Sequence, residues 1–172
     1  MNLEDHWEGV TSKNGYVLFW GGWPSQWHPS NFEIEKVRYN CAEQYMMAEK
    51  ARLFGDQSSL KKIMASRSPK DQKQFGRNVA GFVEQKWTSV CRDVVYRGNL
   101  AKFFQNEDLR QILLSTGTTT IVEASPHDKI WGIGLDRHDP DAMRPSKWKG
   151  KNWLGEAIMR VRAELRAKPS VI

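Results

Sequence analysis

The sequence predicts a mainly α fold, an α-rich α+β domain in which a few short β segments accompany the helices. Five stretches have the apolar spacing of helices, against three short β-type stretches. A chain of 172 residues fits one domain. Its apolar content of 40% and charged content of 27% lie in the usual globular range. We therefore expect a single domain over residues 1–172, with a core at about residues 16–167.

The first forty residues are rich in Gly, Trp and Pro and predict a loop-rich β region. Two short apolar runs, residues 16–20 and residues 37–39, have the length of strands. Between them lie residues that favour turns, namely Gly21, Gly22, Pro24 and Pro29.

A helical pattern starts at Asn40, which we expect to cap it, and ends at Gly55. Ser68 followed by Pro69 is typical of a helix start and predicts a second helix to about Asn78. A third, longer helix is expected over residues 87–106. Its buried side should carry Val90, Val94, Leu100 and Phe104.

The last third of the chain predicts two more helices and one strand. A short helix is expected at residues 107–115, and the β-branched run at residues 119–123 predicts a strand. Residues 131–151 show no periodicity, and loops of this length in compact domains often carry function. The final helix should run over residues 152–167, burying Leu154, Ile158, Val161 and Leu165.

Net charge and cysteine content limit the functional classes to which the protein can belong. A net charge of +6 favours anionic partners, although Lys and Arg are too scattered to form a dedicated nucleic-acid stripe. The two cysteines, Cys41 and Cys91, lack zinc spacing and are expected to be free thiols in a reducing compartment. Neither a signal peptide nor a membrane-spanning run is evident. We expect a cytoplasmic protein without membrane contact.

The first candidate site is the helix that carries Glu43 and Lys50. Seven residues separate them, which puts both on one helix face, with Met47 between. A partly desolvated lysine loses preference for its charged form and becomes available as a nucleophile or a base. The alternative is a solvated pair on an outward face.

Two further blocks have the composition of binding loops. In the first, Gly132 and Gly134 let the backbone approach a ligand and Trp131 offers a flat face, although a packing corner would look the same. In the second, Lys151 and Asn152 begin the final helix, where free N–H groups favour phosphate. An ordinary capped helix is equally consistent with the second block. Four residues of one loop could form a metal site: Asp136, His138, Asp139 and Asp141. An ordinary polar loop explains these residues equally well.

These blocks, taken in order, resemble the NADAR (YbiA-like) family over residues 19–165. The matching motifs are Pro29-Ser30-Asn31-Phe32, the helix from Ala42 to Ala51, Gly76-Arg77, Trp87, Lys102-Phe103, residues 113–117, Val122-Glu123-Ala124, residues 128–135 and residues 150–155. The resemblance implies a mainly helical YbiA-like domain and an N-glycosidase, a hydrolase that cleaves between ribose C1′ and an amine nitrogen. It implies no cofactor and no metal.

The resemblance implies two substrate classes and a set of site residues. The substrates are ADP-ribosylated guanine, as a nucleotide or in nucleic acid, and phosphorylated ribosylaminopyrimidine intermediates of riboflavin synthesis. Lys50 would attack C1′ to form a Schiff base and Glu43 would move protons. In the rival mechanism Glu43 activates water and Lys50 is a charge partner.

Substrate binding is expected from ten residues: Asn31, Phe32, Trp87, Asp128, Trp131, Gly132, Gly134, Asp136, Lys151 and Asn152. Asp128 or Asp136 would hold ribose hydroxyls, and Lys151 and Asn152 the phosphate. Two other functions remain open at this point: a non-catalytic module that binds NAD or ADP-ribose, and, on charge alone, a DNA-binding domain. The sequence does not say whether an ADP-ribosylating toxin is a partner.

Overall fold

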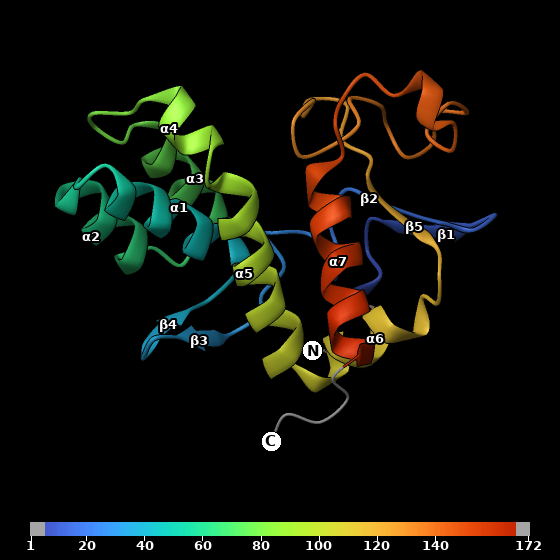
Figure 1. Cartoon of the computed structure of the whole chain (residues 1–172), viewed down its shortest axis with the longest axis horizontal. Coiled ribbons are helices and arrows are strands. Elements are labelled where there is room, and N and C mark those ends of the chain that lie inside the picture. The colour runs from blue at the N-terminus through green and yellow to red at the C-terminus, as the bar shows by residue number, and fades with distance from the viewer. Residues whose placement is uncertain (1–5, 168–172) are drawn as a thin grey trace. The chain divides into compact units, whose positions relative to one another are not determined.

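The computed structural model describes residues 6–167, and the chain packs as two compact units. Unit 1 combines residues 6–28 with residues 107–167, and unit 2 is residues 29–106. Figure 1 shows helices as the dominant elements, with short strands. The expected helix-rich chain with a few β segments is therefore confirmed.

Unit 1 contains a three-stranded sheet covered by the last helix (Figure 1). The strand order is β1 (Val10–Lys13), β2 (Tyr16–Phe19) and β5 (Thr120–Glu123), with β1 antiparallel and β5 parallel to β2. Helix α7 (Trp153–Ala167) packs on β5 and buries the four apolar residues that its spacing predicts. Helix α6 (Glu107–Ser115) packs on α7. The strand predicted at residues 16–20, the strand at residues 119–123 and both helices are confirmed.

Unit 2 is a helical group with one hairpin. Strands β3 (Phe32–Ile34) and β4 (Val37–Tyr39) pair antiparallel through a two-residue turn. Helix α1 (Ala42–Leu53) packs against α2 (Gln57–Ala65), α3 (Pro69–Arg77) and α5 (Cys91–Gln105). Contact on several sides explains why α1 buries eight of its twelve residues rather than a single stripe.

The cap of α1 differs from the expectation. Cys41, not Asn40, is the N-cap residue, and it makes no side-chain cap hydrogen bond. The Asn40 side chain is engaged elsewhere: its Oδ1 accepts from Gln72 Nε2 at 3.1 Å and its Nδ2 donates to the Ser66 carbonyl at 3.4 Å. Tertiary partners thus outcompete the local cap.

Helix α2 was not predicted, because its apolar pattern is short: Leu60, Ile63 and Met64 span little more than one turn. A local signal for it does exist, since the Asp56 side chain accepts from the Ser59 N–H at 2.9 Å and caps the helix. Ser68 caps α3 in the same way and starts it with Pro69 at the first turn, as expected.

The single helix predicted at residues 87–106 is wrong: the structure has α4 (Glu84–Thr88) and α5, separated at Ser89 and Val90. Ser89 Oγ donates to the Lys86 carbonyl at 2.8 Å and so satisfies the end of α4. Val94 is buried as expected, but the rest of the buried side of α5 was misassigned. Phe104 is 38% exposed, whereas Lys102 and Phe103 are fully buried.

The structure also tests what was expected of the cysteines, of membrane-spanning helices and of residues 131–151. Both cysteines are free, buried thiols. Among residues 6–167, no helix has the length and apolar character needed to cross a bilayer. Residues 131–151 form irregular backbone apart from one short 3-10 turn, Pro145–Lys147.

Candidate functional site

The Lys50 amine of α1 lies in an aromatic surrounding within unit 2. Its Nζ is 4.3 Å from the centre of the Phe82 ring and 5.8 Å from that of Trp87. The side chain is half-buried. Burial lowers the pKa of Lys50 from 10.5; the Glu43 charge opposes this shift and the Arg77 charge adds to it.

Glu43 is the partner that the helix spacing predicts. Its side chain is 5% exposed and lies on the same face of α1, close enough for its charge to act on the pKa of Lys50. The neighbouring acid Glu49 is engaged elsewhere, since its carboxylate binds Arg52 at 2.6 Å and Arg97 at 3.7 Å. The outward-facing, solvated alternative for Glu43 and Lys50 is thus not what the structure shows.

Close packing supports this face of α1. Met47 lies between Glu43 and Lys50 along the helix, and a Cβ added to Gly76 of α3 would fall 2.0 Å from the Met47 sulfur. Glycine at position 76 therefore lets α3 approach Met47. Arg77 follows directly and places a cation near the amine.

The sequence interpretation omitted Phe82 and Arg77 from the site. Phe82 is 43% exposed although it is large and apolar, and it lies in a loop where no periodic pattern marks it. Arg77 belonged to a quoted motif, but its proximity to Lys50 depends on the packing of α3 on α1.

The other residues of unit 2 that were expected to bind substrate have different surroundings. Trp87 is half-buried beside Lys50. Phe32 is 3% exposed, stacked on Tyr39 with ring centres 5.6 Å apart, so its ring is largely a core element. Asn31 is exposed, and its carbonyl accepts from Asn106 Nδ2 at 3.0 Å.

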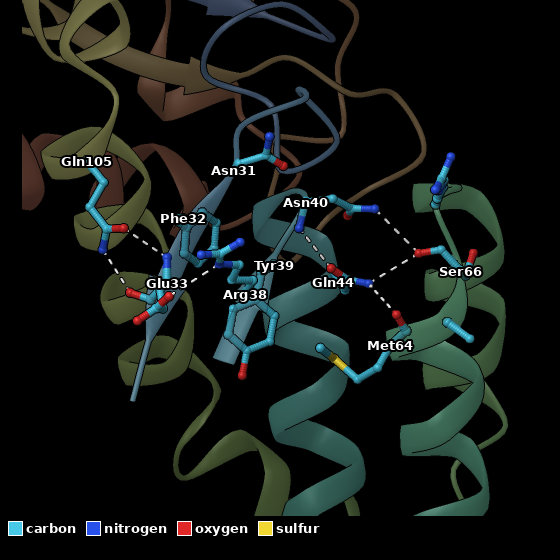
Figure 2. A pocket seen from close by; sticks show the side chains of 12 residues that line it. Asn31, Phe32, Glu33, Arg38, Tyr39, Asn40, Gln44, Met64, Ser66 and Gln105 are labelled. Carbon is cyan, nitrogen blue, oxygen red and sulfur yellow. Dashed lines mark hydrogen bonds and ion pairs between the residues drawn. The ribbon is translucent and has the colours of Figure 1, made fainter. Parts of the chain in front are cut away.

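A cavity of about 590 Å³ opens beside the β3–β4 hairpin, and Asn31 and Phe32 are among its lining residues (Figure 2). It is also lined by Arg38 on β4, Gln44 on α1, and Met64 and Arg67 at the end of α2. A volume of this size suits a small-molecule ligand.

In unit 1, the loop at residues 128–134 is held by the carboxylate of Asp128. Asp128 Oδ1 accepts from the N–H groups of Ile130 at 2.9 Å and Trp131 at 2.8 Å. A Cβ at Gly132 would fall 2.8 Å from the Glu123 carbonyl, and Gly134 has φ +69°. These two glycines are therefore required by close backbone approach and by left-handed geometry.

Trp131 is half-buried and meets Trp153 edge to face, with ring centres 5.8 Å apart. The Lys151 ammonium lies 4.6 Å from the centre of the Trp153 ring, and the residue is exposed. Lys151 is therefore accessible to an anion.

The start of α7 was expected to present free N–H groups, and this expectation is wrong. The Trp153 N–H donates to the Ile130 carbonyl at 3.3 Å, and the Leu154 N–H to the Trp131 carbonyl at 3.1 Å. The Asn152 side chain is also occupied, accepting from the Glu123 N–H at 3.0 Å and donating to the Ile121 carbonyl at 3.0 Å. Loop 128–134 thus already satisfies the helix start.

The acidic loop after Leu135 forms its own turns. Asp136 accepts from the His138 N–H at 2.9 Å, and Asp139 from the Asp141 N–H at 2.8 Å. Across residues 6–167, no three His, Cys, Asp or Glu side chains are grouped so that they could hold a metal ion. The metal-site interpretation of this loop therefore has no structural support.

Comparison with known proteins identifies the family. The NADAR domain model matches residues 18–166, which is most of the chain. The chain belongs to the NADAR domain family. Residues 18–166 include all of unit 2 and most of unit 1.

Relatives of this NADAR chain carry an enzymatic name. It is similar to N-glycosidase R617 of Acanthamoeba polyphaga mimivirus, with 48% identity over 81% of this chain and 85% of the relative. It is 30% identical to N-glycosidase YbiA of Shigella flexneri over 79% of each chain. The NMR structure of YbiA from E. coli matches with a TM-score of 0.76 at 25% identity, covering 98% of this chain and 95% of that one. The predicted enzyme class, a hydrolase that acts on N-glycosyl bonds, is confirmed.

Proposed function

We propose that this NADAR chain hydrolyses the bond between ribose C1′ and an amine nitrogen, and that its substrate is ADP-ribosylated guanine in nucleic acid. One observation carries the proposal: a half-buried Lys50 amine of lowered pKa, held beside two aromatic rings with Glu43 on the same face of α1. A lowered pKa increases the neutral fraction of such an amine, and the neutral form is the nucleophile for carbonyl-type carbon.

The substrate's own nitrogen starts the reaction. Its lone pair opens the ribose ring to an iminium at C1′, with the ring oxygen leaving as a hydroxyl after protonation. Neutral Lys50 then adds to C1′, forming a new C–N bond. Glu43 gives a proton to the departing amine, whose bond to C1′ breaks, and a Schiff base to Lys50 remains.

Hydrolysis of the Schiff base completes the cycle. Water adds to C1′ while Glu43 accepts its proton, and the bond between C1′ and the Lys50 nitrogen breaks. The ribose closes again as a hemiacetal, and the enzyme is regenerated. In the competing route Glu43 activates water for direct attack, and Lys50 serves only as a charge.

Binding roles follow from the chemistry of the remaining residues. We assign stacking or exclusion of water to Trp87 and Trp131, and a phosphate contact to Lys151, whose ammonium is exposed. Asp136 and Asp128 stay candidates for ribose hydroxyls, with part of each carboxylate engaged by backbone N–H groups. Neither a cofactor nor a metal enters any step, and we place the reaction in the cytoplasm.

Two experiments test the glycosidase. Guanine-ADP-ribosylated DNA incubated with the protein should release ADP-ribose. Borohydride added during turnover should reduce the imine and leave the mass of a reduced ADP-ribosyl group on Lys50, found by peptide mass spectrometry. Lys50→Ala should abolish trapping, Glu43→Gln should slow release by about 10²–10⁴-fold, and Lys61→Ala, an exposed helix lysine, should change neither. Release without any trapped adduct would favour direct hydrolysis.

A second substrate is favoured by one comparison. The chain is 34% identical over 116 residues to the Arabidopsis thaliana riboflavin biosynthesis protein PYRR, although this covers only 18% of that protein. Phosphorylated ribosylaminopyrimidines contain the same C1′–amine bond. No release from either substrate, together with calorimetric binding of ADP-ribose that survives Lys50→Ala, would instead indicate a non-catalytic binder.

A further inference from the structure

The loop between α3 and α4, residues 78–83, holds an aromatic ring over the Lys50 amine. The Lys50 Nζ lies 4.3 Å from the centre of the Phe82 ring, and the Trp87 ring centre is further away, at 5.8 Å. An ammonium group within about 6 Å of a ring centre is attracted by the negative face of the ring. Phe82 therefore contacts the nitrogen that acts as the nucleophile in the proposed function.

Phe82 is supported by the protein and is still accessible to a substrate. Its ring meets the ring of Phe54, the C-cap residue of α1, with centres 5.4 Å apart and a tilt of 60°. Even so, Phe82 is 43% exposed, and Lys50 is half-buried. The ring and the amine thus both border solvent, from which C1′ of a substrate can approach.

One carboxylate fixes the loop that carries Phe82. Asp56, the N-cap residue of α2, accepts from the Ser59 N–H with Oδ1 and from the Ala80 N–H with Oδ2, both at 2.9 Å. Hydrogen bonds from Ser59 and Ala80 lower the pKa of Asp56 to about 2, so this carboxylate is charged at neutral pH. Gly81, with φ +69°, supplies the left-handed turn between the Ala80 tether and Phe82. The position of the ring is thus set by a defined contact to α2.

The proposed reaction places positive charge on the nitrogen that Phe82 contacts. When the protonated amine departs with the electrons of its bond to C1′, the Lys50 lone pair forms the C=N bond, and the resulting iminium is a cation. Glu43 favours positive charge at this position and Arg77 opposes it. An aromatic face adds further stabilisation of the cation without introducing another proton acceptor.

We propose that Phe82 is a catalytic residue whose π face stabilises the iminium formed at Lys50, and that Asp56 is a positioning residue that holds Phe82 in place. The inference rests on the proposed function, since it requires the covalent lysine adduct. The ring itself forms and breaks no bond. Its contribution is the attraction between its face and the charge shared by Nζ and C1′.

The competing role for Phe82 is that of apolar bulk, which would only keep water away from the amine. Leucine would fill such a role nearly as well as phenylalanine, because it is also large and apolar, but it has no π face. Tyrosine keeps the aromatic ring. Replacement of Phe82 by leucine and by tyrosine therefore separates the two roles.

The first test compares these variants in turnover of ADP-ribosylated guanine. Phe82→Leu should lower kcat/KM about tenfold and reduce the yield of adduct trapped on Lys50 by borohydride, whereas Phe82→Tyr should stay within about threefold of wild type. Phe104→Leu makes the same change at an exposed ring near the end of α5 and should alter neither value. Equal activity and equal trapping in the leucine and tyrosine variants would overturn the proposal.

The positioning role of Asp56 is tested with Asp56→Asn. Asparagine also caps helices, but its amide has one acceptor oxygen instead of two, so it cannot serve both Ser59 and Ala80. This variant should lower kcat/KM, and the double variant with Phe82→Leu should lose no more activity than Phe82→Leu alone, since both changes remove the same ring contact. A further loss in the double variant would show that Asp56 does not act through Phe82.

A measurement without substrate tests the contact itself. The pKa of Lys50, followed by NMR of ¹³C-labelled lysine side chains in the full chain, should be lower in Phe82→Leu than in wild type or Phe82→Tyr, because loss of the π face removes a contact that favours the ammonium. The rise of kcat/KM with pH should move to lower pH in the same variant. An unchanged Lys50 pKa in Phe82→Leu would contradict the contact.

The proposed function and the role of Phe82 can fail separately. Absence of any trapped adduct in wild type would refute the Schiff base, and with it the catalytic role of Phe82. An adduct that forms in wild type and equally well in Phe82→Leu would refute only the role of Phe82 and leave the lysine mechanism in place.

Discussion

At the scale of single residues, burial sets the reactivity of the lysines. Lys50 is half-buried beside Phe82 and Trp87, and burial lowers its pKa. Lys102 is fully buried on α5, where desolvation lowers its pKa to about 7. Lys50 is the one whose amine lies on the same face of α1 as Glu43, so we assign the chemistry to it.

The pH dependence of the reaction should reflect the neutral form of Lys50. Because its pKa is lowered from 10.5, kcat/KM should rise with pH and level off below pH 10.5. The Arg77 charge contributes to the lowering, so Arg77→Gln should move the rise to higher pH. Lys70→Gln removes an equal charge from the exposed face of α3 and should leave the profile in place. A pH–rate profile with no ascending limb would contradict a lysine nucleophile.

At the scale of elements, α1 is the scaffold of the site, and its neighbours approach closely through small residues. A Cβ on Gly98 of α5 would lie 2.5 Å from Cδ1 of the buried Tyr45 ring on α1. An aromatic ring packed by Phe32 and Tyr39 cannot retreat easily. Glycine at position 98 therefore sets the approach of α5 to α1.

Gly98→Ala should lower the free energy of unfolding by about 1–3 kcal/mol, because the added methyl overpacks the contact despite the better helix propensity of alanine. Urea denaturation measures this difference. Arg92→Ala, at an exposed position on the same helix, should change stability by about 0.5 kcal/mol at most. A neutral or stabilising Gly98→Ala would show that the ring has room to move.

Elements with strong local signals were predictable, and those without were not. Ser68-Pro69 marks the start of α3, and the apolar spacing of α7 marks its buried face. Helix α2 was missed although Leu60, Ile63 and Met64 lie at helical spacing, because a run of nine residues with one fully buried side chain gives only a short pattern. The break between α4 and α5 depends on the Ser89 hydroxyl, which propensity alone does not predict.

At the scale of the whole molecule, the net charge of +6 bears on the polymeric substrate. Cationic side chains displace counterions from phosphates, so affinity for nucleic acid falls as salt rises. For an oligonucleotide carrying ADP-ribosylated guanine, log(kcat/KM) should fall linearly with log[NaCl]. The slope should be steeper than for the ADP-ribosylated mononucleotide, which lacks flanking phosphates. Equal slopes would mean that the flanking strand is not bound.

The sequence by itself determined the family, the enzyme class, the helix-rich character and the shared face of Glu43 and Lys50, because motif order and helical period are local properties of the chain. Only the tertiary structure decided which groups surround them. Phe82 and Arg77 reach Lys50 through packing, while Trp131 and Ile130 carbonyls close the start of α7 that local chemistry would leave open to phosphate. Hydrogen-bond partners and desolvation come from residues distant in sequence, so no local pattern encodes them.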